Sequence, residues 1–127
     1  PYKKDVAEDK RKKIVGVEEI ESNFAQLNIR LNKEYINSWV RNGQEAINSF
    51  IREKPDLILM DIRMPIMDGI QATEKIRTIS LTVPIVAVTA YAFYTEQQQA
   101  IQAGCNAVIS KPYSLERLKE TIESYIG

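Results

Sequence analysis

Short hydrophobic runs alternate with amphipathic segments along most of this chain. Most of the runs are rich in Val, Ile and Leu and end at a polar residue or a turn, which is typical of strands covered on both faces. The runs cover residues 13–17, 36–40, 57–60, 84–88 and 107–110. Each is followed by apolar residues at helical spacing. The sequence therefore predicts an α/β domain, a doubly wound five-stranded parallel sheet with five helices on its two faces.

The segments between the runs have the pattern of amphipathic helices. Three of them begin with a capping residue followed three positions later by Glu or Gln, as in a capping box. These pairs are Asn42 with Glu45, Asp68 with Gln71, and Thr95 with Gln98. Gly104 suits the end of the fourth helix, because glycine readily ends a helix. The predicted core positions on the helices are Phe24, Leu27, Leu31, Ala46, Ile47, Phe50, Ile51, Ala72, Ile76, Ile79, Leu115, Leu118, Ile122 and Tyr125.

Polar residues with complementary chemistry stand at the ends of four runs. Glu18 and Glu19 follow the first run, Asp61 the third, Thr89 the fourth and Lys111 the fifth. In open parallel sheets, ligands bind at the carboxyl ends of the strands. With the strand order 2-1-3-4-5, one of the common doubly wound orders, the three carboxylates would face each other across a cleft. The hydroxyl and the amine would form its far wall.

Three neighbouring carboxylates repel one another, and a pair about 4 Å apart costs about 4 kcal/mol at an effective dielectric constant of about 20. A fold that keeps them together needs shared protons or a divalent cation. Mg²⁺ prefers oxygen ligands and accepts phosphate oxygens, so the pattern indicates phosphoryl transfer with Asp61 as the nucleophile. Thr89 and Lys111 would bind phosphoryl oxygens. Pro112 favours an extended Lys111 and also permits a cis bond.

Composition narrows the classes of function. Seventeen basic and seventeen acidic residues in 127 leave no net charge to attract nucleic acid or an anionic membrane. The absence of histidine excludes histidine-dependent triads, histidine-ligated zinc and a phosphohistidine on this chain. Cys105 is the single cysteine, so no internal disulfide forms. We expect Cys105 to be a small buried side chain and the protein to be cytoplasmic. No apolar stretch reaches the roughly 18 residues of a membrane span.

Residues 1–12 mix basic and acidic side chains without a periodic apolar face. They are interpreted as a charged linker or terminal extension, and residues 13–127 as one domain. No helix-turn-helix pattern follows, so direct nucleic acid binding is not expected. Membrane contact by this chain is not expected either.

Several motifs closely resemble the receiver domains of two-component response regulators. They are Leu59 to Gly69 (LMDIRMPIMDG), Val88-Thr89-Ala90 and Ser110-Lys111-Pro112. The resemblance covers Lys13 to the carboxyl end. Two further segments, Thr89 to Tyr91 and Gly104 to Asn106, resemble receivers attached to hybrid sensor histidine kinases.

The resemblance implies a flavodoxin-like fold and a phosphoacceptor site. Asp61 would accept a phosphoryl group from a phosphohistidine on a histidine kinase or phosphotransfer protein. Glu18 and Glu19 stand at the acidic pair of the family, and together with Asp61 and the backbone carbonyl of Arg63 they would bind Mg²⁺. The resemblance is also compatible with a homodimer.

The resemblance also assigns the residues around the phosphoryl group. Thr89 and Lys111 would be the switch hydroxyl and the switch lysine, and Ala90 would leave room beside the phosphoryl group. Arg63 and Tyr91 stand where family members tune the lifetime of the acyl phosphate. In this scheme the chain is a signalling receiver that catalyses only its own phosphorylation and slow dephosphorylation.

Two residues depart from the family pattern. Glu19 stands where aspartate is usual, and its extra methylene adds about 1.5 Å of reach, so weaker or altered Mg²⁺ binding is expected. Val108 stands where the family commonly has Tyr or Phe, whose ring moves on activation. Either Tyr91, Phe93 or Tyr94 takes the place of that ring, or the coupling of phosphorylation to a ring movement is absent.

Three alternatives compete with the phosphoacceptor switch. One is a pseudo-receiver, an interaction module with little or no phosphorylation, and Glu19 and Val108 favour it. A haloacid-dehalogenase-type phosphatase would need a second acid where Arg63 stands. A flavin carrier of the same fold would bind phosphate after the first strand, where Glu18 and Glu19 would repel it.

Overall fold

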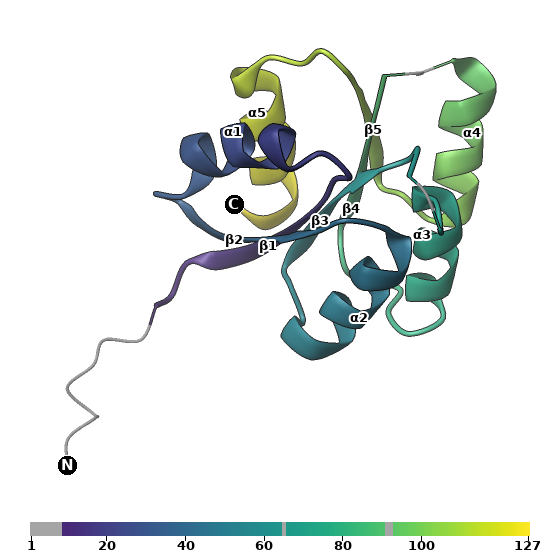
Figure 1. The fold of residues 1–127 in the computed structure, drawn as a ribbon, viewed down its shortest axis with the longest axis horizontal. Coiled ribbons are helices and arrows are strands. Elements are labelled where there is room, and N and C mark those ends of the chain that lie inside the picture. The colour runs from purple at the N-terminus through teal and green to yellow at the C-terminus, as the bar shows by residue number, and fades with distance from the viewer. Residues whose placement is uncertain (1–8, 65, 91–92) are drawn as a thin grey trace.

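The computed structural model describes residues 9–64, 66–90 and 93–127. In this part of the chain five strands form one parallel sheet in the order β2-β1-β3-β4-β5 (Figure 1). The strands are β1 (Lys12–Val17), β2 (Tyr35–Val40), β3 (Leu57–Asp61), β4 (Ile85–Thr89) and β5 (Ala107–Ser110). The predicted fold class and strand order are confirmed.

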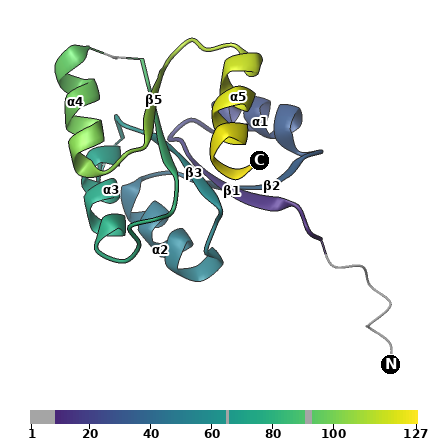
Figure 2. The same ribbon diagram turned by 180° about the vertical axis from the view of Figure 1, so that it is seen from behind.

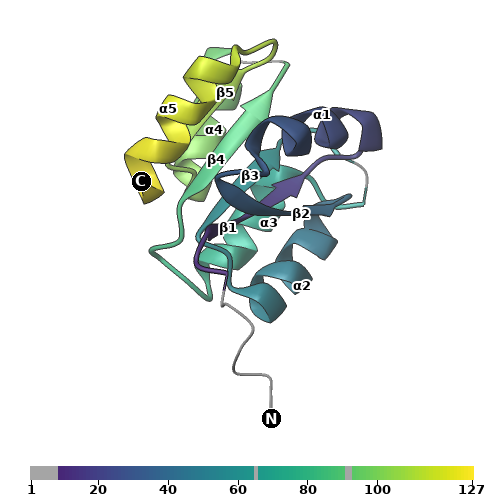
Figure 3. The same ribbon diagram turned by 90° about the vertical axis from the view of Figure 1, so that its left-hand side faces the viewer.

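A helix follows every strand, and the helices cover both faces of the sheet. They are α1 (Glu21–Leu31), α2 (Gly43–Glu53), α3 (Gly69–Arg77), α4 (Tyr94–Ala103) and α5 (Leu115–Ile126). Helices α1 and α5 lie on one face, and α2, α3 and α4 lie on the other (Figures 2 and 3). Within residues 9–64, 66–90 and 93–127, no helix is long and apolar enough to cross a membrane.

Each face of the sheet has its own hydrophobic core, because successive residues of a strand point to opposite faces. In β3, Ile58 and Met60 pack under α2, α3 and α4. Their neighbours Leu57 and Leu59 pack under α1 and α5. Both faces are covered, which explains why β3 is a continuous apolar run rather than an alternating one.

Most predicted core positions are buried; Phe24, Leu27 and Leu115 are half-buried, and three positions are exposed. Ile51 is 56% exposed, Ile79 is 54% exposed and Tyr125 is 39% exposed. Ile79 follows the end of α3 at Arg77, so the helical spacing no longer orients it toward the sheet. Ile51 and Tyr125 stand at the outer edge of their apolar stripes, where a helix of period 3.6 has already turned toward solvent.

The predicted caps are confirmed for two helices. Asn42 accepts a hydrogen bond from the Glu45 amide at the start of α2, and Asp68 forms a complete capping box with Gln71 at the start of α3. Gly104 ends α4 with a φ of 120°, also as predicted.

The cap predicted at Thr95 is wrong. Helix α4 begins at Tyr94, so Thr95 already lies inside it, and Phe93 occupies the cap position without a side-chain hydrogen bond. A cap that the sequence analysis missed is Ser114, whose hydroxyl accepts from the Arg117 amide at the start of α5.

The turn after β3 is packed directly against the backbone of Asp61. The Gly69 amide donates to the Ile62 carbonyl over 2.9 Å. A Cβ atom at Gly69 would lie 2.3 Å from the Asp61 carbonyl oxygen and 2.9 Å from Cγ of Met60. Only a residue without a side chain allows α3 to begin this close to the end of β3. The position of Asp61 therefore depends on Gly69.

Gly69→Ala should lower the free energy of unfolding by about 1–3 kcal/mol, because the added methyl group overlaps backbone atoms that cannot move independently. Urea denaturation followed by circular dichroism measures the change. Glu120→Ala is the control, because Glu120 is an exposed residue inside α5. Equal stability of the wild type and Gly69→Ala would show that the turn relaxes at no cost.

Candidate functional site

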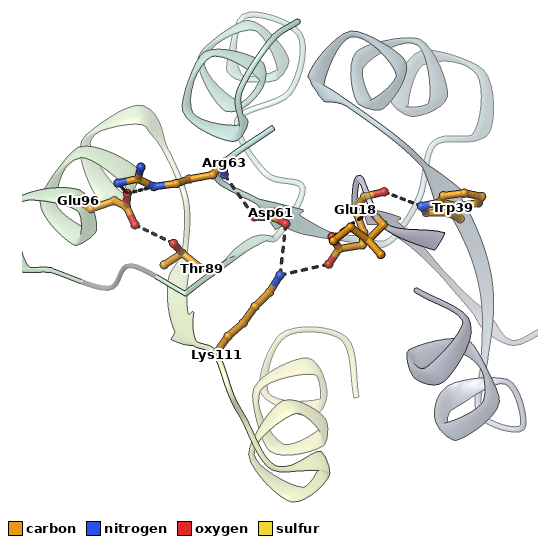
Figure 4. A network of polar contacts seen from close by, with 8 residues as sticks. Glu18, Trp39, Asp61, Arg63, Thr89, Glu96 and Lys111 are labelled. Atoms are coloured by element: carbon orange, nitrogen blue, oxygen red, sulfur yellow. Dashed lines mark hydrogen bonds and ion pairs between the residues drawn. The ribbon is translucent and has the colours of Figure 1, made fainter. Parts of the chain in front are cut away.

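Four polar residues from neighbouring strands meet at one edge of the sheet. Asp61 ends β3 and Thr89 ends β4, while Glu18 directly follows β1 and Lys111 directly follows β5. All strands are parallel, so their carboxyl ends lie at the same edge, as Figure 4 shows for these side chains. The sequence predicted this convergence. The Lys111-Pro112 peptide bond is cis, one of the two forms expected.

The ammonium group of Lys111 joins the two acids. Its Nζ lies 3.2 Å from Glu18 Oε1 and 3.2 Å from Asp61 Oδ2 (Figure 4). The side chains are largely shielded from solvent, with 14% of Glu18, 12% of Asp61 and 27% of Lys111 exposed. The other carboxylate oxygens accept from backbone amides: Asp61 Oδ1 from Arg63 and Glu18 Oε2 from Ile20.

Burial dominates the electrostatics of Asp61. It raises the pKa of Asp61 to about 6, against the attraction of Lys111 and with added repulsion from Glu18. For Lys111, burial alone would lower the pKa, but the charges of Asp61 and Glu18 outweigh it and the pKa is raised. The site therefore holds a fixed ammonium beside a carboxylate whose negative charge is costly, and an additional cation would stabilise that charge.

An aromatic cluster holds the backbone of Glu18. The indole Nε1 of Trp39 donates to the Glu18 carbonyl over 2.7 Å. The Trp39 ring stacks on Phe24 of α1, with ring centroids 5.9 Å apart, and the Arg41 guanidinium lies 5.2 Å from the Trp39 ring. Trp39 thus links the edge strand β2, helix α1 and the turn that carries Glu18; Figure 4 shows its hydrogen bond to Glu18.

A second polar group lies on the α4 side of the site. The Thr89 hydroxyl donates to Glu96 Oε1 over 2.7 Å, and the Arg63 guanidinium contacts Glu96 Oε2 through Nε at 3.2 Å and Nη2 at 3.1 Å. Thr89 is 1% exposed. Glu96 was not predicted as a site residue, because nothing in the local sequence pattern shows that α4 brings it over the end of β4.

The predicted third acid does not join the cluster. Glu19 is exposed, and the part of the chain that the structure describes holds no group of three or more Asp, Glu, Cys or His side chains arranged to bind a metal. Three converging carboxylates are therefore not found, because the turn after β1 directs only Glu18 inward. Two carboxylates remain, a number that Mg²⁺ commonly uses together with waters and phosphate oxygens.

The other predicted positions have different surroundings. Ala90 is exposed and lines a pocket beside Lys111. Val108 is half-buried in β5 and packs against the core under α2, α3 and α4. Phe93 and Tyr94 are 67% and 74% exposed. Tyr91 lies outside the described residues.

A pocket of about 470 Å³ opens next to the site between α1 and the start of α5. Glu18 and Lys111 form its inner end, and Leu27, Arg30 and Tyr113 line its sides. Burial raises the pKa of Tyr113, so this phenol stays neutral and keeps its proton. The pocket gives a partner side chain a path to Lys111, a feature that strand-end chemistry alone did not predict.

Comparisons with known proteins place this geometry in a family. A family model for the response regulator receiver domain matches residues 14–123. The polar-differentiation response regulator DivK of Brucella anthropi is 38% identical over 110 residues, covering 80% of this chain and 89% of DivK. The sensor histidine kinase RcsC of Salmonella typhi is 39% identical over 84 residues, which are 66% of this chain and 9% of RcsC.

Solved structures agree with the sequence relatives. The receiver domain of the sensor histidine kinase PA1611 from Pseudomonas aeruginosa, solved with a magnesium ion coordinated in its active site cleft, has a TM-score of 0.85 and 33% identity, covering 92% of this chain and 98% of that one. The Saccharomyces cerevisiae receiver domain of Ssk1, solved with the phosphotransfer protein Ypd1, has a TM-score of 0.84 and 30% identity, covering 91% and 88%. The chain belongs to the response regulator receiver domain family of two-component signalling.

Proposed function

We propose that this chain is a phosphoacceptor switch in a phosphorelay, with Asp61 as the residue that takes the phosphoryl group. The observation that carries the proposal is the shared ammonium of Lys111, which lies 3.2 Å from both Asp61 and Glu18 at the carboxyl edge of the sheet. An ammonium group fixed beside a nucleophilic carboxylate is placed to bind an oxygen of an incoming phosphoryl group.

The transfer step balances without another reactant. An Asp61 carboxylate oxygen forms a bond to phosphorus, the P–N bond of a donor phosphohistidine breaks, and the imidazole nitrogen keeps the electron pair. Lys111 then pairs with a phosphoryl oxygen. The Thr89 hydroxyl would donate to another oxygen, and exposed Ala90 leaves space beside it. Hydrolysis of the acyl phosphate resets the switch, and no external substrate is turned over.

The residues at the site fit a magnesium ion. Glu18, Asp61 and the Arg63 backbone carbonyl would hold it, and all are hard oxygen donors. When bound, the ion supplies positive charge that lowers the cost of an ionised Asp61 and of phosphoryl oxygens. The raised pKa of Asp61 supports this assignment, since it reports a carboxylate that lacks sufficient compensating charge. Glu19 would reach the ion only through a change of its side-chain orientation.

The donor is a phosphohistidine on a histidine kinase or phosphotransfer protein. The pocket supports this partner, because its apolar and basic lining from α1 lies beside Lys111, which contacts Asp61. The similar receiver domain of Ssk1 was solved in complex with a partner of this type, the histidine phosphotransfer protein Ypd1. The receiver unit would extend over residues 13–127, with residues 1–12 as an extension, and the RcsC match favours a hybrid kinase as its parent protein.

A pseudo-receiver is the second candidate, and the exposure of Glu19 favours it. In this candidate Glu19 stays turned to solvent, Mg²⁺ binding is weakened for lack of that ligand, and phosphorylation is slow. In that case Asp61→Asn would leave partner binding unchanged.

Incubation with acetyl phosphate and Mg²⁺ should add the mass of one phosphoryl group to the wild-type protein and none to Asp61→Asn. Intact-mass spectrometry measures both. Asp68→Asn is the matched control, because asparagine also caps a helix well and Asp68 lies at the start of α3. An unmodified wild-type protein would favour the pseudo-receiver, and a modified Asp61→Asn would place the phosphoryl group elsewhere.

Asp61→Asn should also stabilise the metal-free protein near neutral pH. The pKa of Asp61 is about 6 in the folded protein against an ordinary value of 3.8, so its contribution to stability is fully present below about pH 4 and is lost as the pH rises through 6. Asparagine avoids this loss. In EDTA at about pH 7.5, the gain should be about 1–2 kcal/mol after allowance for solvent screening. Urea denaturation should show the gain shrinking towards pH 4, and a constant gain would contradict the assigned cause.

Glu19→Asp should bind Mg²⁺ severalfold more tightly, because the shorter side chain suits a near-octahedral ion held close to β1. Fluorescence of Trp39, the single tryptophan, measures the binding, since its indole donates to the Glu18 carbonyl. Glu21→Asp shortens a nearby acid in the first turn of α1 and should change nothing. Equal affinity of Glu19→Asp and the wild type would remove Glu19 from the metal site.

A further inference from the structure

The Thr89 hydroxyl is already engaged in the structure, and its partner is not at the strand edge. It donates to Glu96 Oε1 over 2.7 Å, toward α4, while Lys111 and Asp61 contact each other on the other side (Figure 4). A hydrogen bond from a hydroxyl to a carboxylate is charge-assisted and is stronger than one between neutral groups. The resting acceptor of Thr89 is therefore a strong one.

A hydroxyl has only one proton to donate. When Thr89 donates to Glu96, the same proton cannot be donated to an oxygen on a phosphorylated Asp61. The two acceptors therefore compete for one hydrogen bond. The hydrogen bond from Thr89 to Glu96 must break before the hydroxyl can donate to the phosphoryl group.

Arg63 fixes Glu96 in the position for this competition. Its Nε and Nη2 lie 3.2 and 3.1 Å from Glu96 Oε2, so the other oxygen, Oε1, is turned to Thr89. The Glu96 side chain is only 12% exposed, although the Arg63 side chain is 59% exposed. A shielded carboxylate held at both oxygens loses less of its hydrogen-bond strength to water than an exposed one.

We propose that Glu96 is a positioning residue that holds the Thr89 hydroxyl away from the phosphoryl site and so sets how readily the phosphorylated conformation forms. The inference rests on the proposed phosphoacceptor function of Asp61. Release of Thr89 breaks one hydrogen bond to Glu96 and forms one to a phosphoryl oxygen, while Glu96 keeps Arg63 as its partner. No proton is transferred in this exchange.

The exchange also connects the site to α4. Glu96 lies in the first turn of α4, and Arg63 belongs to the turn after β3. When Thr89 turns toward the phosphoryl group, one of the contacts that tie the start of α4 to the end of β4 is lost. Helix α4 is then less firmly held to the sheet, which provides a route for the site to alter this face without an aromatic residue at Val108.

A simpler role for Glu96 is favourable placement of an acid near the positive end of the α4 dipole. That role predicts a loss of helix stability when the charge is removed, with no dependence on the Thr89 hydroxyl. The two roles can therefore be separated by replacing Thr89: only the positioning role requires its hydroxyl.

The test uses beryllium fluoride with Mg²⁺, a non-covalent phosphoryl mimic that binds an aspartate carboxylate. Glu96→Gln keeps the shape of the side chain but replaces a charged acceptor by a neutral one. The beryllium fluoride concentration at half-saturation, followed by Trp39 fluorescence, should fall about fivefold in Glu96→Gln, because a neutral acceptor competes less well for Thr89. The lifetime of the acyl phosphate after acetyl phosphate treatment should lengthen in parallel.

Three further variants make the result specific. Glu116→Gln removes an exposed acid from the first turn of α5 and should leave the half-saturating concentration unchanged. In Thr89→Val, which lacks the hydroxyl, adding Glu96→Gln should produce no further change, although Thr89→Val itself binds more weakly. Urea denaturation of each variant confirms that it is folded at the assay temperature.

The results separate the role of Glu96 from the phosphoacceptor function of Asp61. If the wild type binds beryllium fluoride and Glu96→Gln binds it equally or more weakly, the role of Glu96 is overturned and the phosphoacceptor function stands. An equal gain in the Thr89→Val background also overturns it, because the effect then comes from charge alone. If the wild type fails to bind, the phosphoacceptor function fails, and the role of Glu96 fails with it.

Discussion

The ammonium group of Lys111 lies between two carboxylates that repel each other, and the chemistry of the site depends on this placement. Asp61 and Glu18 come from neighbouring strands and are largely shielded from water, so without Lys111 their charges would be poorly compensated. Even with it, burial raises the pKa of Asp61 to about 6. The negative charge of the site is thus incompletely neutralised, which suits the site to a further cation.

The fold was predictable from the sequence because its main signals are local and repeated. A strand such as β3 is an uninterrupted apolar run, and Asn42 and Asp68 cap the helices that follow β2 and β3. The failures are also local. Thr95 resembles a cap, but the cap position of α4 is Phe93, two residues earlier, and no pattern in the sequence distinguishes the two positions. Ile51 and Ile79 fit a helical period, yet both are exposed, because Ile51 lies at the outer edge of its apolar stripe and Ile79 follows the end of α3.

The site was predictable to the extent that strand ends determine it. Asp61, Thr89 and Lys111 are each at or directly after a strand end, so the parallel sheet alone brings them to one edge. Glu19 was expected beside them but faces solvent, because a residue in a turn has no fixed side-chain direction that periodicity can predict. Trp39, Glu96 and Tyr113 act across elements, and their contacts depend on tertiary packing that a single sequence does not show.

Trp39 gives the site a mechanical connection to the surface around it. Its ring is stacked on Phe24 of α1, and its indole proton holds the carbonyl of Glu18. Helix α1 also forms one wall of the pocket next to Lys111. Under the proposed function, ion binding at Glu18 and docking of a donor along α1 would therefore both act on the cluster of Phe24 and Trp39. By thermodynamic reciprocity, whichever of the two events occurs first changes the affinity for the other by the same factor.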